Sequence, residues 1–239
     1  MSAPPVEARR HRRPDRRIVE VGGGDRVDYL QRMLTQDVER LEPGAAVDAC
    51  VLTPQGRLVG VPVVLHAGDV HLLDVDAATV ADVIGQLERT VITEDVTFRD
   101  LGAGLDRLTV VGAGAPAAIA AWGGDAPGAG RHVVLRGGAR VLRRDLGAVP
   151  AYELFLGEGT AAPELPDLPD DAWTAIRLAE RLPAWGAELG PDVMPLEARL
   201  AETALSLSKG CFPGQEPVAM AWHRGHPARL LVRVALEGA

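Results

Sequence analysis

The residues best suited to chemistry lie in one octapeptide, Lys209-Gly210-Cys211-Phe212-Pro213-Gly214-Gln215-Glu216. It holds one of only two cysteines, flanked by glycine and close to a lysine. Glycine and proline prescribe a specific, tight backbone path, and a thiol near a cation ionises more easily than an isolated one. This pattern fits a nucleophile, a redox thiol or a metal ligand at Cys211. The structural alternative is a turn after a helix, in which the cysteine fills a small hole.

The other cysteine and two histidines give weaker signals. Cys50 lies in an apolar strand and is expected in the core. His223 and His226 could bind a soft metal together with Cys211, but their spacing before a proline is more typical of a surface loop. Two cysteines are too few to hold a [4Fe–4S] cluster within one chain. A cluster held between chains stays open, and no metal site is predicted.

Composition bounds the class of protein. The 239 residues suffice for one large domain or two small ones, and with 47% apolar but only 4% aromatic residues the core must rest on valine, leucine and alanine. The sequence lacks a run of about 18 apolar residues and an apolar signal-peptide core, so we expect a protein of the cytoplasm without a membrane span. Two widely spaced cysteines fit that reducing compartment.

Charge is unevenly distributed along the chain. Six arginines fall within residues 1–17, although the whole chain has a formal net charge of −8. The acidic remainder argues against general nucleic-acid binding. We expect residues 1–16 to form a flexible basic arm, which could alternatively touch RNA or an acidic partner.

Hydrophobic periodicity predicts short strands joined by turns and interrupted by isolated helices. This alternation favours an α+β fold with largely antiparallel sheets. Residues 157–170 are rich in proline, glycine and acidic residues and read as a connector. The expected strands are 18–21, 47–52, 58–65, 70–75, 96–98, 108–111, 133–135, 140–143, 152–156 and 230–236. The expected helices are 25–34, 77–89, 116–122, 171–182 and 197–204, with 218–222 as either strand or helix.

Four segments together indicate a family. They read Tyr-Leu-Gln-Arg-Met-Leu-Thr-Gln-Asp-Val at 29–38, Leu-Thr-Pro-Gln-Gly-Arg-Leu at 52–58, Ile-Arg-Leu-Ala-Glu-Arg-Leu-Pro-Ala-Trp-Gly at 176–186, and the octapeptide. In this order they resemble the YgfZ-type folate-binding proteins, relatives of the aminomethyltransferase T-protein of glycine cleavage. The run Gly-His-Pro-Ala-Arg-Leu at 225–230 resembles the actinobacterial version of the family. The resemblance runs from about residue 17 to the end, and the octapeptide is its most specific part.

The resemblance implies an aminomethyltransferase-like folate-binding fold. Its core would be discontinuous, built from residues 17–94 and 161–239. A ferredoxin-like subdomain, here residues 95–160, would be inserted between them. Relatives add a C-terminal β-barrel, which this sequence would lack.

The resemblance also implies a role in which tetrahydrofolate, or a derivative, is bound and iron–sulfur cluster assembly or repair is supported. Cys211 and Lys209 would carry the activity, in a motif loop that includes Gly210, Gly214, Gln215 and Glu216. The folate pocket would involve Arg177, Trp185, Asp37 and Glu180. The implied partners are folate and iron–sulfur proteins or their assembly factors.

Two departures weaken the link to carbon transfer. Ala179 stands where the T-protein has an acidic residue, Glu180 is one position away, and Arg181 replaces the relatives' glycine. No carboxylate occurs in the strand around Gly60, although aminomethyl transfer needs a charge to position and activate the folate nitrogen. We therefore expect a binding protein rather than a turnover enzyme. A tetrahydrofolate-dependent aminomethyltransferase and an interaction module without a ligand are the alternatives.

Overall fold

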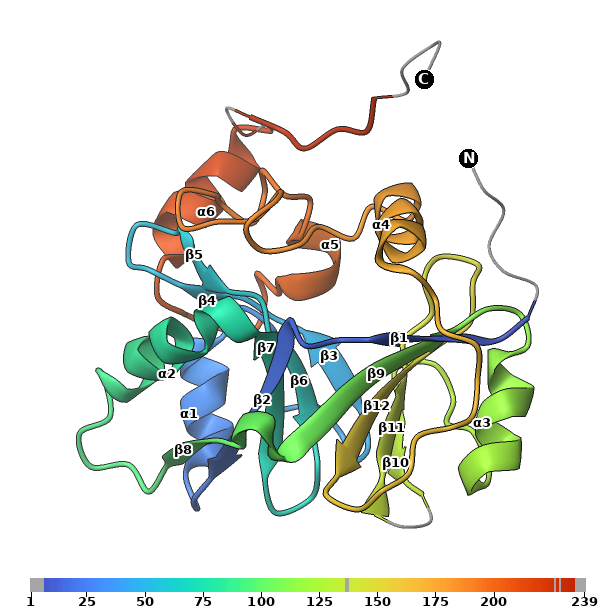
Figure 1. Cartoon of the computed structure of the whole chain (residues 1–239). Coiled ribbons are helices and arrows are strands. Elements are labelled where there is room, and N and C mark those ends of the chain that lie inside the picture. Colours follow the sequence, from blue (N-terminus) through green and yellow to red (C-terminus); the bar gives the residue numbers. More distant parts are fainter. Residues whose placement is uncertain (1–6, 136–137, 226, 228, 235–239) are drawn as a thin grey trace.

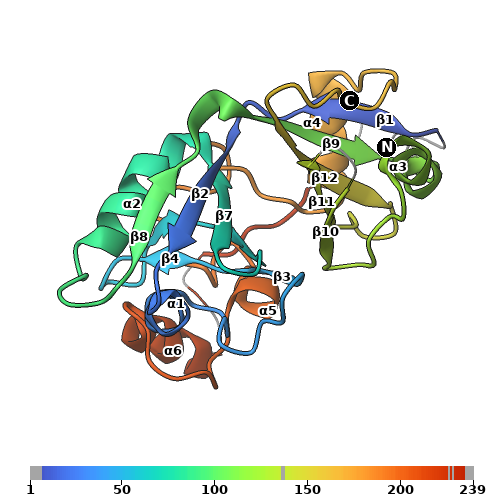
Figure 2. The ribbon, with the colours of Figure 1, turned by 90° about the horizontal axis from the view of Figure 1, so that it is seen from below.

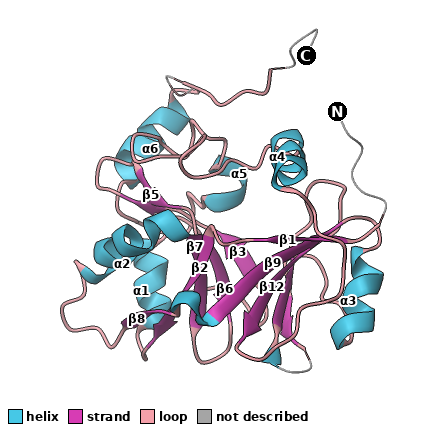
Figure 3. Cartoon of the chain, in the orientation of Figure 1, coloured by secondary structure: helices cyan, strands magenta, loops and turns pink. Residues whose placement is uncertain are grey.

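The computed structural model describes residues 7–135, 138–225, 227 and 229–234. Two five-stranded antiparallel sheets stand side by side, and a third region of helices and loops lies across their upper end (Figure 1). Figure 3 shows how helices and strands alternate along the chain. The expected α+β class with antiparallel sheets is confirmed. None of the helices formed by the described residues is long and apolar enough to cross a membrane.

The first sheet has the order β3-β6-β7-β2-β8. Alternate side chains of a strand point to opposite faces: in β2, Val19 and Val21 pack with the helices, whereas Ile18 faces the second sheet. Helix α1 contributes Tyr29 and Leu30 to the outer face. The strands are β2 (Arg16–Gly22), β3 (Ala46–Asp48), β6 (Val63–His66), β7 (His71–Asp76) and β8 (Thr97–Asp100). The helices are α1 (Arg26–Met33), the 3₁₀ turn η1 (Ala77–Thr79) and α2 (Val80–Glu88).

The second sheet has the order β1-β9-β12-β11-β10. A single helix, α3, packs on its outer side, away from the first sheet (Figure 2). Leu142 and Phe155 of this sheet meet Ile18 and Leu72 of the first in a shared apolar cluster. The strands are β1 (Arg9–Arg12), β9 (Leu105–Val111), β10 (His132–Val134), β11 (Arg140–Arg143) and β12 (Ala151–Gly157). The helical elements are the 3₁₀ turn η2 (Gly102–Gly104) and α3 (Ala115–Gly123).

The expected subdomain boundaries differ from this arrangement. Strand β8 was expected in the inserted unit, yet it pairs with β2 of the first sheet. A ferredoxin-like unit follows a β-α-β-β-α-β pattern. Here α3 joins β9 to β10, but β11 and β12 pair directly as antiparallel neighbours. The second sheet thus follows only the first half of the pattern, and β1 supplies its outer strand.

The basic N-terminus is not a flexible arm over its described part. Arg9–Arg12 form β1, which pairs in register with β9. Arg10 binds the Asp167 carboxylate at 2.7 Å, and Arg13 binds Asp15 at 2.8 Å. An arginine-rich stretch looks solvated in the sequence, but here Arg10 is matched by an acidic residue distant in sequence and Arg13 by one two positions away. Residues 1–6 lie outside the described part.

A buried charge network joins the two sheets. Arg107 of β9 pairs with Asp74 of β7, and Arg16 binds the same carboxylate at 3.1 Å. Burial alone would raise the pKa of Asp74, but Arg107 and Arg16 hold it below its usual value. On the β9–β12 side, the Thr109 hydroxyl donates to the Glu153 carboxylate at 3.0 Å. Buried charged groups of this kind are compatible with a stable fold only when each keeps its oppositely charged or hydrogen-bonding partners.

The third region carries the site. A two-stranded hairpin, β4 (Val51–Leu52) and β5 (Leu58–Gly60), extends from the first sheet toward three helices. The hairpin region shares an apolar cluster with α5 and α6 that includes Cys50, Leu58, Phe212 and Val218. The helices are α4 (Asp170–Ala179), α5 (Ala201–Ala204) and α6 (Gln215–His223).

Several expected elements differ in extent. The strand expected over 58–65 is split into β5 and β6, with Pro62 between them, because proline cannot donate a ladder hydrogen bond. The helix expected over 197–204 is confined to its last four residues. Residues 218–222 are helical. The strand expected over 230–236 is wrong for the described residues 230–234, which contain none.

Candidate functional site

The octapeptide forms a loop that leads into α6. Gly210 has φ 106° and Gly214 has φ 78°, both in the left-handed region that favours glycine. Gly214 is the N-cap residue of α6, so Gln215 and Glu216 form its first turn. The Gln215 side chain folds back and accepts a hydrogen bond from the Phe212 amide at 3.2 Å. The sequence therefore builds a short, internally bonded loop ahead of a helix.

Within this loop the thiol and the amine have different surroundings. Cys211 is a free, exposed thiol, whereas Lys209 is half-buried. The Lys209 ammonium donates to the main-chain carbonyl of Gln31 and lies 5.6 Å from the centre of the Phe212 ring. Burial lowers the pKa of Lys209 to about 8, against the opposing effect of Asp37 and Cys211. Lys209 is also the only lysine in the chain.

Asp37, expected near the folate pocket, lies on this side of the site. Its carboxylate accepts from the Gln31 side-chain amide at 3.2 Å and from the Arg40 backbone amide at 3.4 Å. The second bond, between residues three positions apart, is that of a turn. Asp37 therefore shapes the turn after α1 and acts electrostatically on Lys209.

The glycine turn of the second segment packs directly on the octapeptide. A Cβ placed on Gly214 would lie 2.4 Å from the Thr53 carbonyl oxygen and 2.9 Å from the Gly56 Cα. A Cβ on Gly56 would in turn lie 3.0 Å from the Pro217 ring. Only glycine allows two backbones to approach this closely. Three of the four segments singled out in the sequence thus meet at one place.

The fourth segment reaches the site through one residue. Trp185 packs against the apolar cluster that contains Phe212. Arg177 is engaged elsewhere, donating to the Glu188 carboxylate at 2.8 Å. Glu180 ends α4, and its carboxylate lies against Gly147 of the second-sheet region. The described contacts therefore bring Trp185, but neither Arg177 nor Glu180, into the octapeptide cluster.

The two departures noted in the sequence have structural counterparts. Gly60 is buried against α2, and a Cβ there would lie 2.5 Å from Val83 Cγ2, so no acidic side chain fits at this position. Arg181, where relatives have glycine, keeps a left-handed backbone with φ 58°. The Ala179 carbonyl accepts from the Arg233 guanidinium at 2.9 Å. The Gly60 and Ala179 positions thus offer no carboxylate for the folate nitrogen.

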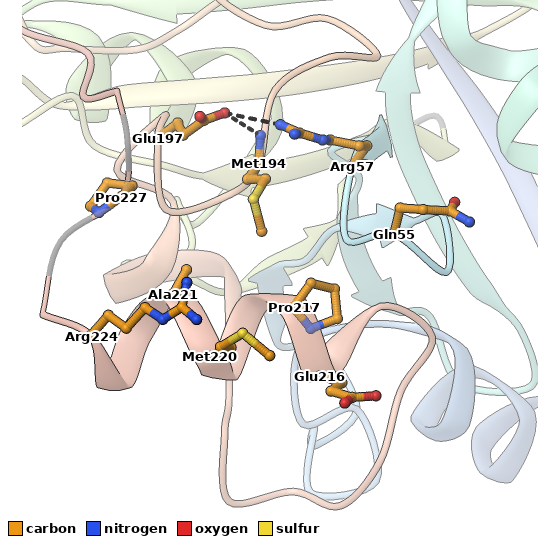
Figure 4. A pocket seen from close by; sticks show the side chains of 10 residues that line it. All are labelled: Gln55, Arg57, Met194, Glu197, Glu216, Pro217, Met220, Ala221, Arg224 and Pro227. Atoms are coloured by element: carbon orange, nitrogen blue, oxygen red, sulfur yellow. Dashed lines mark hydrogen bonds and ion pairs between the residues drawn. The ribbon is translucent and has the colours of Figure 1, made fainter.

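A pocket of about 540 Å³ opens on the far side of the hairpin turn, along α6 (Figure 4). Its carboxylate Glu197 accepts from the Met194 amide at 2.8 Å and from Arg57 at 3.5 Å. Glu216, the last residue of the octapeptide, lies near one end of the helical wall and Arg224 near the other. The sequence did not predict this pocket, although Glu216 belongs to the motif loop. The lining residues are Gln55, Arg57, Met194, Glu197, Glu216, Pro217, Met220, Ala221, Arg224 and Pro227.

The histidines considered as metal ligands are not gathered around the thiol in the described structure. His223 is exposed at the end of α6, and His226 lies outside the described residues. Among the residues that are described, no group of three or more histidine, cysteine, aspartate or glutamate side chains is placed to hold a metal ion. Cys50 is buried, as expected for a core cysteine.

Known proteins are similar to this chain in sequence and in fold. An aminomethyltransferase of Bacillus velezensis is 27% identical over 89% of this chain and 63% of that protein. Proteins named as tRNA-modifying protein YgfZ are 27% identical in Yersinia enterocolitica, over 91% of this chain and 68% of that protein, and 29% in Serratia proteamaculans, over 90% and 67%. The crystal structure of glycine cleavage system aminomethyltransferase T from Bartonella henselae superposes with a TM-score of 0.81 at 19% identity, over 93% of this chain and 65% of that one.

The chain is similar in sequence to YgfZ proteins and to aminomethyltransferases, and it has the aminomethyltransferase fold. No protein-family model matches it. The chain spans half to about two thirds of the length of these curated relatives. The TM-score of 0.81 establishes the fold, whereas the activity has to be argued from the site.

Proposed function

We propose that the chain is a folate-binding YgfZ-like protein that supports iron–sulfur cluster assembly or repair through Cys211. The observation that carries this proposal is the exposed Cys211 thiol beside the half-buried Lys209 amine. Both sit on a loop held by the turn after α1 and by the glycine turn of the hairpin. A single thiol exposed on a rigid scaffold is better suited to reacting with a partner than to filling space in a core.

Tetrahydrofolate, or a derivative, is the proposed ligand. A pterin needs a flat apolar surface and a carboxylate that accepts its ring hydrogens, and the glutamate tail of folate needs a cation. Trp185 and Asp37 fit the first two needs at the octapeptide side. Arg177 is a cation of the right kind, but it must release Glu188 before it can bind the tail. Glu180, turned toward Gly147, fits less well.

The proposed chemistry of the thiol is transient ligation. Cys211 offers one sulfur to an iron–sulfur cluster or its iron, and Lys209 can hold or release a proton beside it near neutral pH. A complete [4Fe–4S] cluster normally needs four thiolates. The remaining ligands must therefore come from the partner, which we propose to be an iron–sulfur protein or an assembly factor in the cytoplasm.

The test separates the pocket from the thiol. Tetrahydrofolate titration of the wild type and of Cys211→Ala should give similar affinities, because the thiol is not part of the proposed folate contacts. In cells lacking the gene, the wild type should restore the activity of iron–sulfur enzymes and Cys211→Ala should not. No binding by either protein, together with full enzyme activity in the deletion strain, would show the proposal to be wrong.

A tetrahydrofolate-dependent aminomethyltransferase is the second candidate, favoured only by the fold and by relatives with that name. The absence of a carboxylate at Gly60 and Ala179 speaks against it. Formation of methylene-tetrahydrofolate from an aminomethyl donor by the purified protein would establish this activity.

An interaction module without a ligand is the third candidate. It is favoured by large apolar side chains exposed on α6 and on the segment after it, namely Met220, Trp222, Leu230, Val232 and Val234. Self-association in solution, with slow hydrogen exchange confined to this face, would support it. Direct RNA binding, suggested by the name of the YgfZ relatives, is not favoured, since Arg10, Arg13 and Arg16 of the N-terminal stretch are committed to acidic partners.

A further inference from the structure

Gln31 of α1 contacts Lys209 at two separate points. Its side-chain amide donates to the Lys209 main-chain carbonyl at 3.4 Å, and its own main-chain carbonyl accepts from the Lys209 ammonium. The two residues are 178 positions apart in the sequence. The main chain and the side-chain amine of Lys209 are therefore both hydrogen-bonded to one residue of α1.

The same side chain also defines the turn after α1. Its amide oxygen accepts from the Val38 amide at 2.7 Å and the Glu39 amide at 3.1 Å. Its nitrogen donates to the Asp37 carboxylate at 3.2 Å. A primary amide has two donors and one acceptor oxygen with two lone pairs, so this half-buried side chain uses its full hydrogen-bonding capacity. A fully bonded amide of this kind is held in one orientation.

A lysine at position 209 has a chemical property that an arginine there would lack. Every other residue among the 25 lysines and arginines is an arginine, and a guanidinium does not lose its proton in proteins, whereas a lysine amine can. The usefulness of that amine beside Cys211 depends on where it is held. What holds it is the Gln31 carbonyl at one end and the Gln31 side chain at the other.

We propose that Gln31 is the positioning residue that fixes the Lys209–Cys211 turn against α1. The inference deepens the proposed role of Cys211 and rests on it. Gln31 does not touch the thiol; it acts through Lys209 and Asp37. Replacing its side chain frees the turn to move away from α1 and exposes the lysine amine to water.

The single lysine allows a direct measurement. Protein labelled with ¹³C-lysine gives one lysine ε-carbon signal, whose nuclear Overhauser contacts report the distance of the Lys209 amine from α1. Gln31→Met keeps the length and bulk of the side chain, and it keeps the main-chain carbonyl that accepts from Lys209, but it cannot form the four side-chain hydrogen bonds. The matched control is Gln36→Met, because Gln36 binds the Thr203 carbonyl and the Asp37 amide rather than the octapeptide. Gln31→Glu, which keeps the acceptor for the two turn amides, serves if Gln31→Met does not fold.

In the wild type and in Gln36→Met we expect the Lys209 ε-carbon to show contacts with α1, where the Gln31 carbonyl accepts from the ammonium. In Gln31→Met these contacts should weaken several-fold, because the side-chain bonds that hold the loop against α1 are lost. Gln31→Glu should lose the contacts as well. A contact pattern in the Gln31 variants equal to that of Gln36→Met would overturn the inference.

A cell assay then distinguishes the inference from the function beneath it. If Lys209 is displaced in Gln31→Met and iron–sulfur enzymes lose activity, both stand. If Lys209 is displaced and the enzymes are also unaffected by Cys211→Ala, the proposed function fails while Gln31 keeps its positioning role. The contact measurement requires neither folate nor a client protein.

Discussion

The two cysteines differ in access to solvent, and this difference predicts their reactivity. Burial raises the pKa of Cys50 to about 12, despite its contact with Thr35, whereas Cys211 is exposed. Because the thiolate is the nucleophile, iodoacetamide should label Cys211 alone in the folded protein. Mass spectrometry after labelling in buffer and in guanidinium chloride measures this. The Cys211→Ala protein should take up no label until it is unfolded, and labelling of Cys50 in buffer would contradict the structure.

Residue roles were predictable where the local sequence carries them. Glycine and proline around Cys211 indicated an open loop, and the apolar neighbours of Cys50 indicated the core. The bonds from Gln31 to Lys209 could not be predicted, because they join residues whose separation in the chain carries no local signal. The ion pair of Arg177 with Glu188 likewise has no local signal in the sequence.

At the scale of elements, the contact between two glycine turns supports a matched pair of substitutions. In Gly214→Ala the new methyl group would overlap the Thr53 carbonyl, while in Gly210→Ala it would meet nothing within 4 Å. Both positions have positive φ, so both alanines carry a backbone cost of about 1 kcal/mol. Gly214→Ala should lose at least about 1 kcal/mol more in the free energy of unfolding, measured with urea. Equal losses would mean that the two turns do not touch.

The positions of the strands and helices could be predicted from the hydrophobic pattern, whereas the pairing of the strands could not. The strand expected over 18–21 is confirmed within β2. The helix expected over 77–89 is also found, as η1 followed by α2, and Asp76 caps its start by accepting from the Ala78 amide at 3.0 Å. The pairing of β1 with β9 was missed because arginine-rich strands lack an apolar signature. Their neutralising acids come from other parts of the chain.

At the scale of the molecule, the charge network between the sheets should make a large contribution to stability. Removing one partner of a buried pair leaves a charge without compensation, at a cost of about 3–5 kcal/mol. Arg107→Leu should therefore lower the free energy of unfolding by roughly 3 kcal/mol, because Arg16 still partly neutralises Asp74. Denaturant unfolding measures this.

Two controls define that prediction. Arg17→Ala removes a partly exposed pair with Asp100 and should cost less than about 1 kcal/mol. The double variant Arg107→Leu/Asp74→Leu should be more stable than Arg107→Leu alone, because no unpaired carboxylate remains. A double variant less stable than the single one would indicate that packing, rather than charge, dominates at this junction.

Buried histidine predicts the acid sensitivity of the whole fold. Burial lowers the pKa of His71 to about 4, and the nearby His66 and Arg26 lower it further. Neither ring nitrogen has a hydrogen-bond partner among the residues that the structure describes. Below pH 6.5, the ordinary pKa of histidine, the His71 ring binds a proton in the unfolded chain but stays neutral in the folded protein. The stabilising effect is therefore complete above pH 6.5 and is lost as the pH falls toward 4, by up to about 3 kcal/mol.

The measurement compares the free energy of unfolding at pH 7 and pH 5. His71→Leu should weaken the pH dependence, although His132, whose pKa burial also lowers to about 4, retains part of it. His223→Leu, at an exposed position, should leave the dependence as it is in the wild type. A wild-type stability that is flat between pH 7 and pH 5 would contradict the burial of His71.

Strand β1 has a consequence for any attempt to divide the molecule. Arg9 pairs with Val111, and β2 begins only four residues after β1 ends, in the other sheet. A fragment that starts after β8 would keep β9 but lose the strand that covers its outer edge. Such an open edge recruits strands from other molecules. The excised second sheet should therefore aggregate unless residues 9–12 are supplied as a peptide that restores the missing edge strand.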